Sequence, residues 1–117
     1  MSNFVDLGQE IGKQLYDKKV TTSQIRKFLS AVNTVANKIQ TEKEQLSPSL
    51  ADEIQYLRVK LAYQAGRETK REGGLHYLQE NLDKSIKNIG NSKSEFEKFN
   101  KLVETIVAYH KFFGGQD

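Results

Sequence analysis

Residues 57–67 read LRVKLAYQAGR, a stretch whose apolar positions recur at the three-to-four-residue spacing of an amphipathic helix. Leu57 and Leu61 extend an apolar stripe that starts at Leu50 and Ile54. A second stripe on a different side of this helix combines aromatic rings with cations: Tyr56, Lys60, Tyr63, Arg67 and Lys70. The sequence therefore predicts a helix that packs through one face and offers phosphate a binding surface on another.

The same spacing continues on both sides of this stretch. It predicts an all-α fold, a single-domain helical bundle of about five helices across residues 1–117, and no segment alternates as a β-strand would. The expected apolar stripes cover residues 4–15, 25–39, 50–61, 75–89 and 96–113. Phe4 and Leu7 belong to the first stripe, where Gly8 is small enough to let another helix approach closely.

Several residues have the chemistry of helix boundaries. Two pairs have the spacing of a capping box: Thr21 with Gln24, and Ser92 with Glu95. A third helix is expected to begin at Ser47 and Pro48, because serine caps helices and proline suits the first helical position. This helix is expected to run to about Lys70, with a possible early end at Gly66 and a firmer stop at residues 73–74, both glycine.

Composition narrows the class of protein. The chain has 117 residues and no cysteine, so a disulfide framework and a thiolate zinc site are excluded. No apolar run reaches the roughly 20 residues needed to span a bilayer, and the N-terminus lacks a signal-peptide pattern. These features predict a soluble, cytoplasmic protein that does not contact membranes.

The sequence gives little support for catalysis, and we predict no catalytic residue, no metal site and no cofactor. His76 and His110 are far apart, and neither has a ligand-type partner four residues further on. His110 lies on the apolar face of the last helix, where a histidine is usually a core or interface residue hydrogen-bonded to the backbone. Asp52 and Glu53 are adjacent, so they point to different sides of a helix and are expected to be solvated.

The cations are unevenly distributed, although the net charge is only +3. Residues 18–41 contain five lysines and arginines and no acid, and residues 58–71 contain five against Glu68 alone. One helix face of the first segment separates its cations with small side chains: Lys27, Ala31, Thr34 and Lys38. Such a face suits a sugar-phosphate backbone, and Tyr56 and Tyr63 would pack against sugars or splayed bases. From composition alone, two interpretations of these cations are equally supported: they bind phosphate, or they are ordinary solvated side chains on helix faces.

Three blocks of sequence carry a further signal. They read TTSQIRKFL at 21–29, LRVKLAYQAGR at 57–67 and, after Phe96 and Phe99, VETIVAYHK at 103–111. In this order they resemble the small subunit of the type III-A CRISPR effector complex. Val59 stands where that family often has proline, and Thr105 where it often has alanine. None of the blocks is a catalytic signature, so the resemblance rests on their order and extent.

The resemblance implies a non-catalytic, all-helical subunit of an antiviral ribonucleoprotein, bound to the other subunits of the effector complex. Copies of it are expected to stack head to tail along the guide RNA and its paired target RNA. Contact with the RNA backbone, without sequence specificity, then belongs to basic residues in the matching blocks: Arg26, Lys27, Arg58, Lys60 and Arg67. The helical faces add four nucleic-acid-binding candidates: Lys38, Tyr63, Lys70 and Arg71. The alternative hypothesis is a structural helical adaptor that binds acidic protein partners and no nucleic acid.

Overall fold

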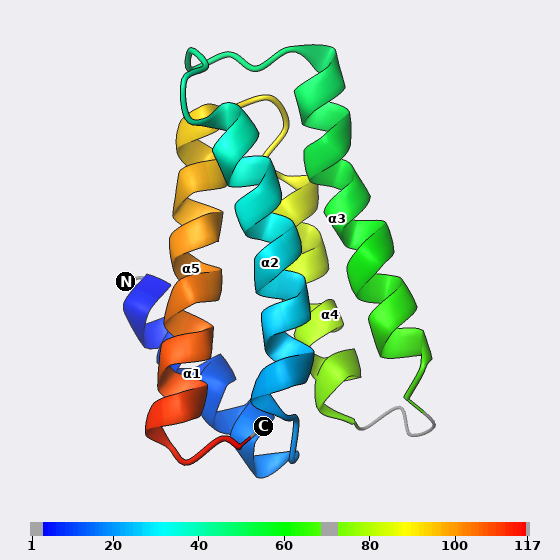
Figure 1. Cartoon of the computed structure of the whole chain (residues 1–117), viewed down its shortest axis with the longest axis vertical. Coiled ribbons are helices and arrows are strands. Elements are labelled where there is room, and N and C mark those ends of the chain that lie inside the picture. The colour runs from blue at the N-terminus through cyan, green and yellow to red at the C-terminus, as the bar shows by residue number, and fades with distance from the viewer. Residues whose placement is uncertain (1–3, 69–72, 117) are drawn as a thin grey trace.

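The computed structural model describes residues 4–68 and 73–116, which form five α-helices joined by short connections (Figure 1). The helices are α1 (Phe4–Asp17), α2 (Thr22–Ile39), α3 (Pro48–Gly66), α4 (Gly74–Lys87) and α5 (Lys93–Phe112). The described residues contain no strand, and a single isolated bridge pairs Gln45 with Ser92. The prediction of an all-α bundle of about five helices is confirmed.

The helices pack as a chain of neighbours around one core. α5 packs against α1 and α2, and α3 packs against α2 and α4. Each helix contributes a side chain that is completely buried or nearly so: Leu15, Val32, Ile54, Leu82 and Ile106. Burial of these apolar stripes is the main favourable term in folding. Among the described helices, none combines the length and the apolar character needed to cross a membrane.

The expected helix caps are present, one of them only in part. At α2 the capping box is complete, because the Gln24 amide donates to Thr21 Oγ1 at 3.2 Å and the Thr21 amide donates to Gln24 Oε1 at 2.9 Å. At α5 the Glu95 amide donates to Ser92 Oγ at 3.2 Å. The Ser92 amide donates instead to the carbonyl of Ile89, so the second half of that box is replaced by a turn.

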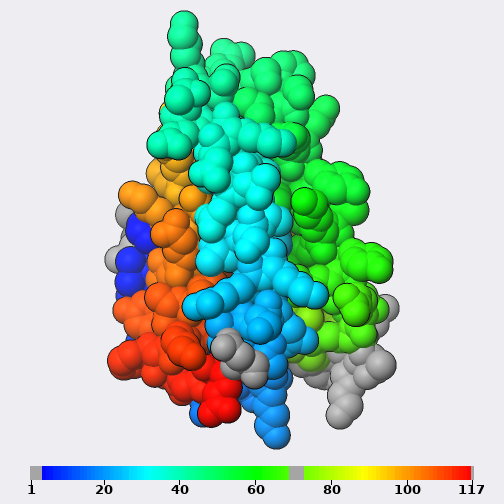
Figure 2. All heavy atoms as spheres, viewed as in Figure 1, coloured from blue at the N-terminus to red at the C-terminus, as the bar shows by residue number. Residues whose placement is uncertain are grey.

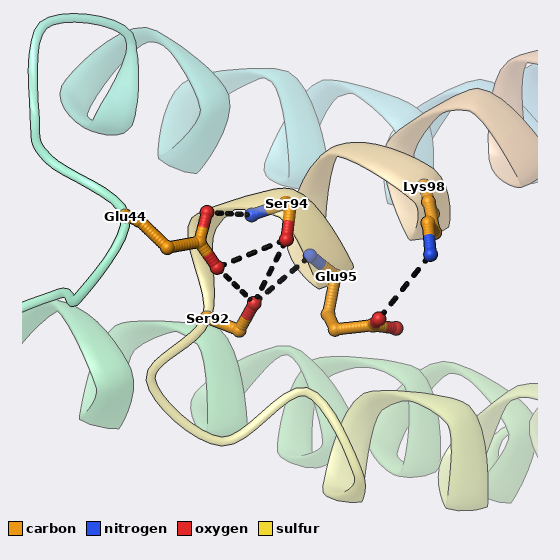
Figure 3. A network of polar contacts seen from close by, with 5 residues as sticks. All are labelled: Glu44, Ser92, Ser94, Glu95 and Lys98. Atoms are coloured by element: carbon orange, nitrogen blue, oxygen red, sulfur yellow. Dashed lines mark hydrogen bonds and ion pairs between the residues drawn. The ribbon is translucent and has the colours of Figure 1, made fainter.

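Glu44, in the connection between α2 and α3, reaches across to the N-terminus of α5 (Figure 3). Its Oε1 accepts from the Ser94 amide at 3.0 Å, and its Oε2 accepts from the hydroxyls of Ser92 and Ser94. These hydrogen bonds, that of Ser92 first, hold the pKa of the Glu44 carboxyl below its usual value. A carboxylate is also favoured by the partial positive charge at a helix N-terminus. One turn further on, Lys98 pairs with Glu95 at 3.4 Å. Glu44 thereby fixes the α2–α3 connection to the start of α5.

α3 begins where the sequence predicts and ends earlier. The Leu50 amide donates to Ser47 Oγ at 3.2 Å, which confirms the expected cap. α3 does not extend to about Lys70, which lies outside the described residues; it ends at Gly66, the early end that the sequence also allowed. Glycine is roughly 1 kcal/mol less favourable than alanine inside a helix, and the next amide, that of Arg67, turns back to the carbonyl of Gln64.

The glycine pair after α3 has a different role from the expected stop signal. Gly73 is the N-cap of α4 and Gly74 is its first helical residue. Gly73 has no side chain to offer the free amides of the first turn, and the carboxylate of Glu68 takes that place. Glu68 Oε2 accepts from the Leu75 amide at 3.1 Å, and Oε1 accepts from the His76 amide at 3.0 Å.

The apolar stripe of α1 is buried only in its second half. Ile11 and Leu15 of the predicted stripe belong to the core, whereas Phe4 and Leu7 of the same stripe are 40% and 43% exposed. The buried face of α1 is rotated toward Gly12, where the backbone of α1 touches α5. Since successive helical residues are 100° apart, this rotation turns Leu7 to the edge of the contact, and Phe4 lies in the first helical turn.

Candidate nucleic-acid interface

α2 and α3 lie side by side on one face of the bundle, which Figure 2 shows with α2 along its middle and α3 beside it. Gln64 of α3 joins the two helices, because its Nε2 donates to the Gln24 carbonyl of α2 at 2.6 Å. Two hollows open between these helices, and together they are called the α2–α3 groove below. The groove brings together residues from both basic segments of the sequence.

The larger hollow, of about 680 Å³, lies beside the N-terminal half of α3 and is called the upper hollow. Its lining includes two of the predicted RNA-binding cations, Lys38 and Lys60. Lys38 Nζ lies 2.8 Å from Glu53 Oε1, so a carboxylate already partners this charge. Lys60 Nζ lies 6.0 Å from the centroid of the Tyr56 ring and has no acidic partner among the described residues. Lys60 is therefore the more available cation for a phosphate.

The smaller hollow, of about 250 Å³, lies beside the C-terminal end of α3 and is called the lower hollow. Lys27 of α2 and Arg67, the C-cap of α3, line it from opposite sides. Neither forms an ion pair within the part of the chain that the structure describes. Glu68 also lines this hollow, but its two oxygens accept from the first amides of α4. Two predicted cations thus converge here with their charges unpaired.

Arg58 lies on the other side of α3, against α4. Its Nε and a terminal nitrogen donate to the two carboxylate oxygens of Asp83 at 2.8 and 3.1 Å, a bidentate pair in which each side chain is about one-third exposed. The hydrogen bond raises the pKa of Arg58 and lowers that of Asp83. In this structure Arg58 connects two helices, and it does not line the α2–α3 groove.

The remaining predicted residues are less closely grouped. Arg26 is exposed on α2 but lines neither hollow, since it is turned 100° from Lys27 around the helix. Tyr63 is 72% exposed on the outer side of α3 and also lines neither hollow. Lys70 and Arg71 lie outside the described residues.

The structure adds acidic and polar residues that the sequence did not assign to a site. Asp52 and Glu53, expected to be solvated, both line the upper hollow. Asp52 is exposed as expected, whereas one carboxylate oxygen of Glu53 is covered by protein atoms. No local signal connects Glu53 with Lys38, because the two are 15 residues apart and meet only when α2 packs beside α3. The described residues contain no cluster of three or more histidines and acids able to hold a metal ion.

The Arg58–Asp83 pair predicts a pH-dependent stability. The lowered pKa of Asp83 contributes stability that is complete above its unfolded value, about 3.9, and is lost as the pH falls through the folded value. We expect Asp83→Asn to lower the urea midpoint at pH 7, and the difference from the wild type to shrink below about pH 4. The control is Asp52→Asn, because Asp52 is exposed and forms no ion pair among the described residues. This variant should leave the urea midpoint nearly unchanged. Equal midpoints for wild type and Asp83→Asn at pH 7 would contradict the role of the pair.

The fold and this face define a small helical protein with a partly basic groove between two of its helices. The chain matches the family model Csm2 Type III-A over residues 1–116. Three relatives named CRISPR system Cms protein Csm2 are similar to it. The protein from Streptococcus thermophilus is 36% identical over 98 residues, which cover 84% of this chain and 76% of the relative. The protein from Enterococcus italicus is 35% identical over 97 residues, which cover 80% of this chain and 68% of the relative.

The relative from Mycobacterium tuberculosis is 29% identical over 100 residues, covering 85% of this chain and 79% of the relative. The chain belongs to the Csm2 family, the small subunit of the type III-A CRISPR complex. The family resemblance inferred from three blocks of sequence is therefore confirmed.

Proposed function

We propose that this subunit binds the backbone of the guide RNA and its paired target RNA through the α2–α3 groove, without sequence specificity and without catalysing a reaction. The observation that carries the proposal is the convergence of Lys27, Lys60 and Arg67 on one groove, all three without an acidic partner among the described residues. Cations on rigid helices bind phosphate regardless of the base attached to it. Such binding suits a subunit that serves any guide sequence.

The spacing of the cations supports contact with more than one phosphate. Lys60 lies on α3 and Arg67 is the C-cap of that helix seven residues later, which places them about 10 Å apart along the helix axis. Lys27 faces Arg67 from α2, so the lower hollow presents charge from both walls. Lys38 adds a fourth cation whose bond to Glu53 a phosphate would have to replace. We expect weak binding by one copy and stronger binding by several copies on one RNA.

The two ends of the bundle suggest how copies stack in the cytoplasmic complex. Residues 18–27 carry four cations and no acid, at the end where α1 meets α2, and residues 42–53 carry four acids and one lysine, at the end where α2 meets α3 (Figure 1). Opposite charge on the two ends favours head-to-tail contact between copies. An interface of this kind joins different surfaces, so it produces a filament when the rotation does not close a ring.

Charge reversal tests the RNA site. In a variant with Lys60→Glu and Arg67→Glu, the affinity for a single-stranded RNA should fall at least tenfold at low salt, because two phosphate contacts are replaced by repulsion. The slope of log affinity against log salt should become shallower by about 1.4, since each phosphate contact contributes about 0.7 for single strands. Binding is measured by fluorescence anisotropy at several salt concentrations.

The matched control reverses two exposed lysines on other helices, Lys13→Glu on α1 and Lys101→Glu on α5, with the same change in net charge. At about 0.15 M salt it should retain affinity within about twofold, because exposed charges farther from the RNA than about 8 Å are then largely screened. Equal losses in both double variants would contradict a site in the groove. If the groove variant bound RNA normally but failed to join its partner subunits, the adaptor hypothesis would be favoured.

A further inference from the structure

The upper hollow has a lining that a phosphate alone does not explain. Lys38 and Lys60 lie at this hollow, but Asp52 and Glu53 line it as well. A phosphate inside would face two carboxylates, so like-charge repulsion favours phosphate binding near the lysines outside the hollow. The apolar part of the lining consists of Ala31, Val35 and Leu57. The hollow therefore suits a neutral, partly apolar group connected to an anionic chain.

Tyr56 gives this hollow an aromatic surface. The residue is 57% exposed, although it lines the hollow, and its ring lies 6.0 Å from Lys60 Nζ. Aromatic rings beside cations are the usual platform for unpaired nucleotides, because the base stacks on the ring while the cation attracts the phosphate. Tyr56 and Lys60 are four residues apart on α3, so they lie on the same side of the helix.

Glu53 adds a hydrogen-bond acceptor to the hollow. Its Oε1 accepts from Lys38, while its Oε2 is covered by protein atoms and has no hydrogen-bond partner among the described residues. Because Oε2 is covered, only Oε1 of this partly exposed side chain, which keeps a second lone pair beside its bond to Lys38, can accept from a group in the hollow. Asp52 is exposed at the same hollow and is a second acceptor. The exocyclic amines of adenine, cytosine and guanine are neutral donors of the kind that carboxylates accept.

We propose that the upper hollow binds one unpaired RNA base that carries an exocyclic amine, with the base stacked on Tyr56 and its neighbouring phosphate on Lys60. The volume of about 680 Å³ lies within the range of small-ligand sites. This inference rests on the proposed function, because it names the part of the RNA that the groove receives. It adds a preference for amine-bearing bases at one position to a surface that otherwise binds the RNA backbone without sequence specificity.

A fluorescent base tests the inference. The probe is a single-stranded RNA of uridines with one central 2-aminopurine, which is then the only base with an exocyclic amine and which loses fluorescence when it stacks on an aromatic ring. The full-length wild type should quench the probe at saturation. Tyr56→Ala should bind the same RNA about tenfold more weakly and should not quench it at saturation, since base stacking contributes this order of affinity. Tyr56→Phe keeps the ring and should quench as the wild type does.

The outcomes separate this inference from the function on which it rests. If the probe binds with a normal salt dependence but keeps its fluorescence, base binding is wrong and backbone binding stands. The same conclusion follows if Tyr56→Ala quenches the probe as the wild type does. If the wild type binds no RNA at any salt concentration, the proposed function and the base site both fail. An RNA with an abasic position in place of 2-aminopurine should bind more weakly than the probe, and equal affinity would contradict the inference.

Discussion

Replacing Gly12 with valine is expected to lower the free energy of unfolding by about 3 kcal/mol, because overpacking against fixed atoms costs roughly 1–3 kcal/mol and this contact leaves no room. A Cβ on Gly12 would lie 2.9 Å from the amide nitrogen of His110 and 2.9 Å from the carbonyl oxygen of Ile106. Both atoms belong to the backbone of α5, so no side-chain rotation relieves the clash. α1 would have to move away from α5 along its main contact. Urea denaturation followed by circular dichroism measures the loss.

The matched control is Gly66→Val, the same substitution at the end of α3. A Cβ at Gly66 meets nothing within 4 Å, and its backbone does not have a positive φ. The stability of this variant should stay within about 0.5 kcal/mol of the wild type, because valine and glycine differ little in helix propensity. If Gly12→Val were as stable as Gly66→Val, the close backbone contact between α1 and α5 would be wrong.

The helices, and the first residues of α2, α3 and α5, were predictable because the signals for them are local. Periodic apolar spacing identifies a helix within a few turns, and the caps at Thr21 and Ser47 depend on residues three positions further on. α4 ends at Lys87, and in the turn beyond it Gly90 has a left-handed conformation with φ of 60°, which glycine adopts readily. These features need no knowledge of distant residues.

The errors in the predicted fold have distant causes. Phe4 and Leu7 have the spacing of core residues, but the face of α1 that is buried is decided by contact with α5, nearly one hundred residues later. The glycines at 73–74 were predicted to end α3, whereas the Glu68 carboxylate makes them the start of α4. Tertiary contacts override local propensity in both cases.

In the candidate site, too, local features were predictable from the sequence and contacts between distant residues were not. Helical periodicity grouped Lys60, Tyr63 and Arg67 on one stripe; Lys60 and Arg67 line the α2–α3 groove, whereas Tyr63 lines neither of its hollows. The approach of Lys27 from α2 depended on which faces pack together, which one sequence does not specify. The pairing of Arg58 with Asp83 was not predictable for the same reason. The cations that are available to bind phosphate can therefore be identified only after their long-range acidic partners are known.

The ion pairs make some cations of the groove more available to a phosphate than others. Lys38 is paired with Glu53 in the upper hollow, whereas Lys27 and Arg67 have no acidic partner among the described residues in the lower hollow. A phosphate gains most where no carboxylate must be displaced. We therefore expect the RNA backbone to bind first at the lower hollow, and the upper hollow to receive the less charged part of the nucleotide chain.

His110→Ala is the second substitution with a large expected effect, a loss of about 3 kcal/mol from the free energy of unfolding, since the change leaves a cavity and removes a buried hydrogen bond. The imidazole is completely buried, and Nε2 lies 2.6 Å from the carbonyl oxygen of Val20. A carbonyl only accepts, so Nε2 carries the proton and fixes the tautomer. The bond connects α5 to the turn before α2, and it confirms the predicted core histidine bonded to backbone.

Two variants separate the cavity from the hydrogen bond. His110→Phe fills most of the volume but cannot donate to Val20, so it should lose about 1–3 kcal/mol, the penalty of leaving a buried acceptor without its donor. His76→Ala, at a half-buried histidine of α4, should lose less than about 1 kcal/mol because no large cavity forms. Thermal and urea unfolding measure all three variants. If His110→Phe were as stable as the wild type, the hydrogen bond would be dispensable. If His110→Ala were as stable as the wild type, the buried position of the ring would be contradicted.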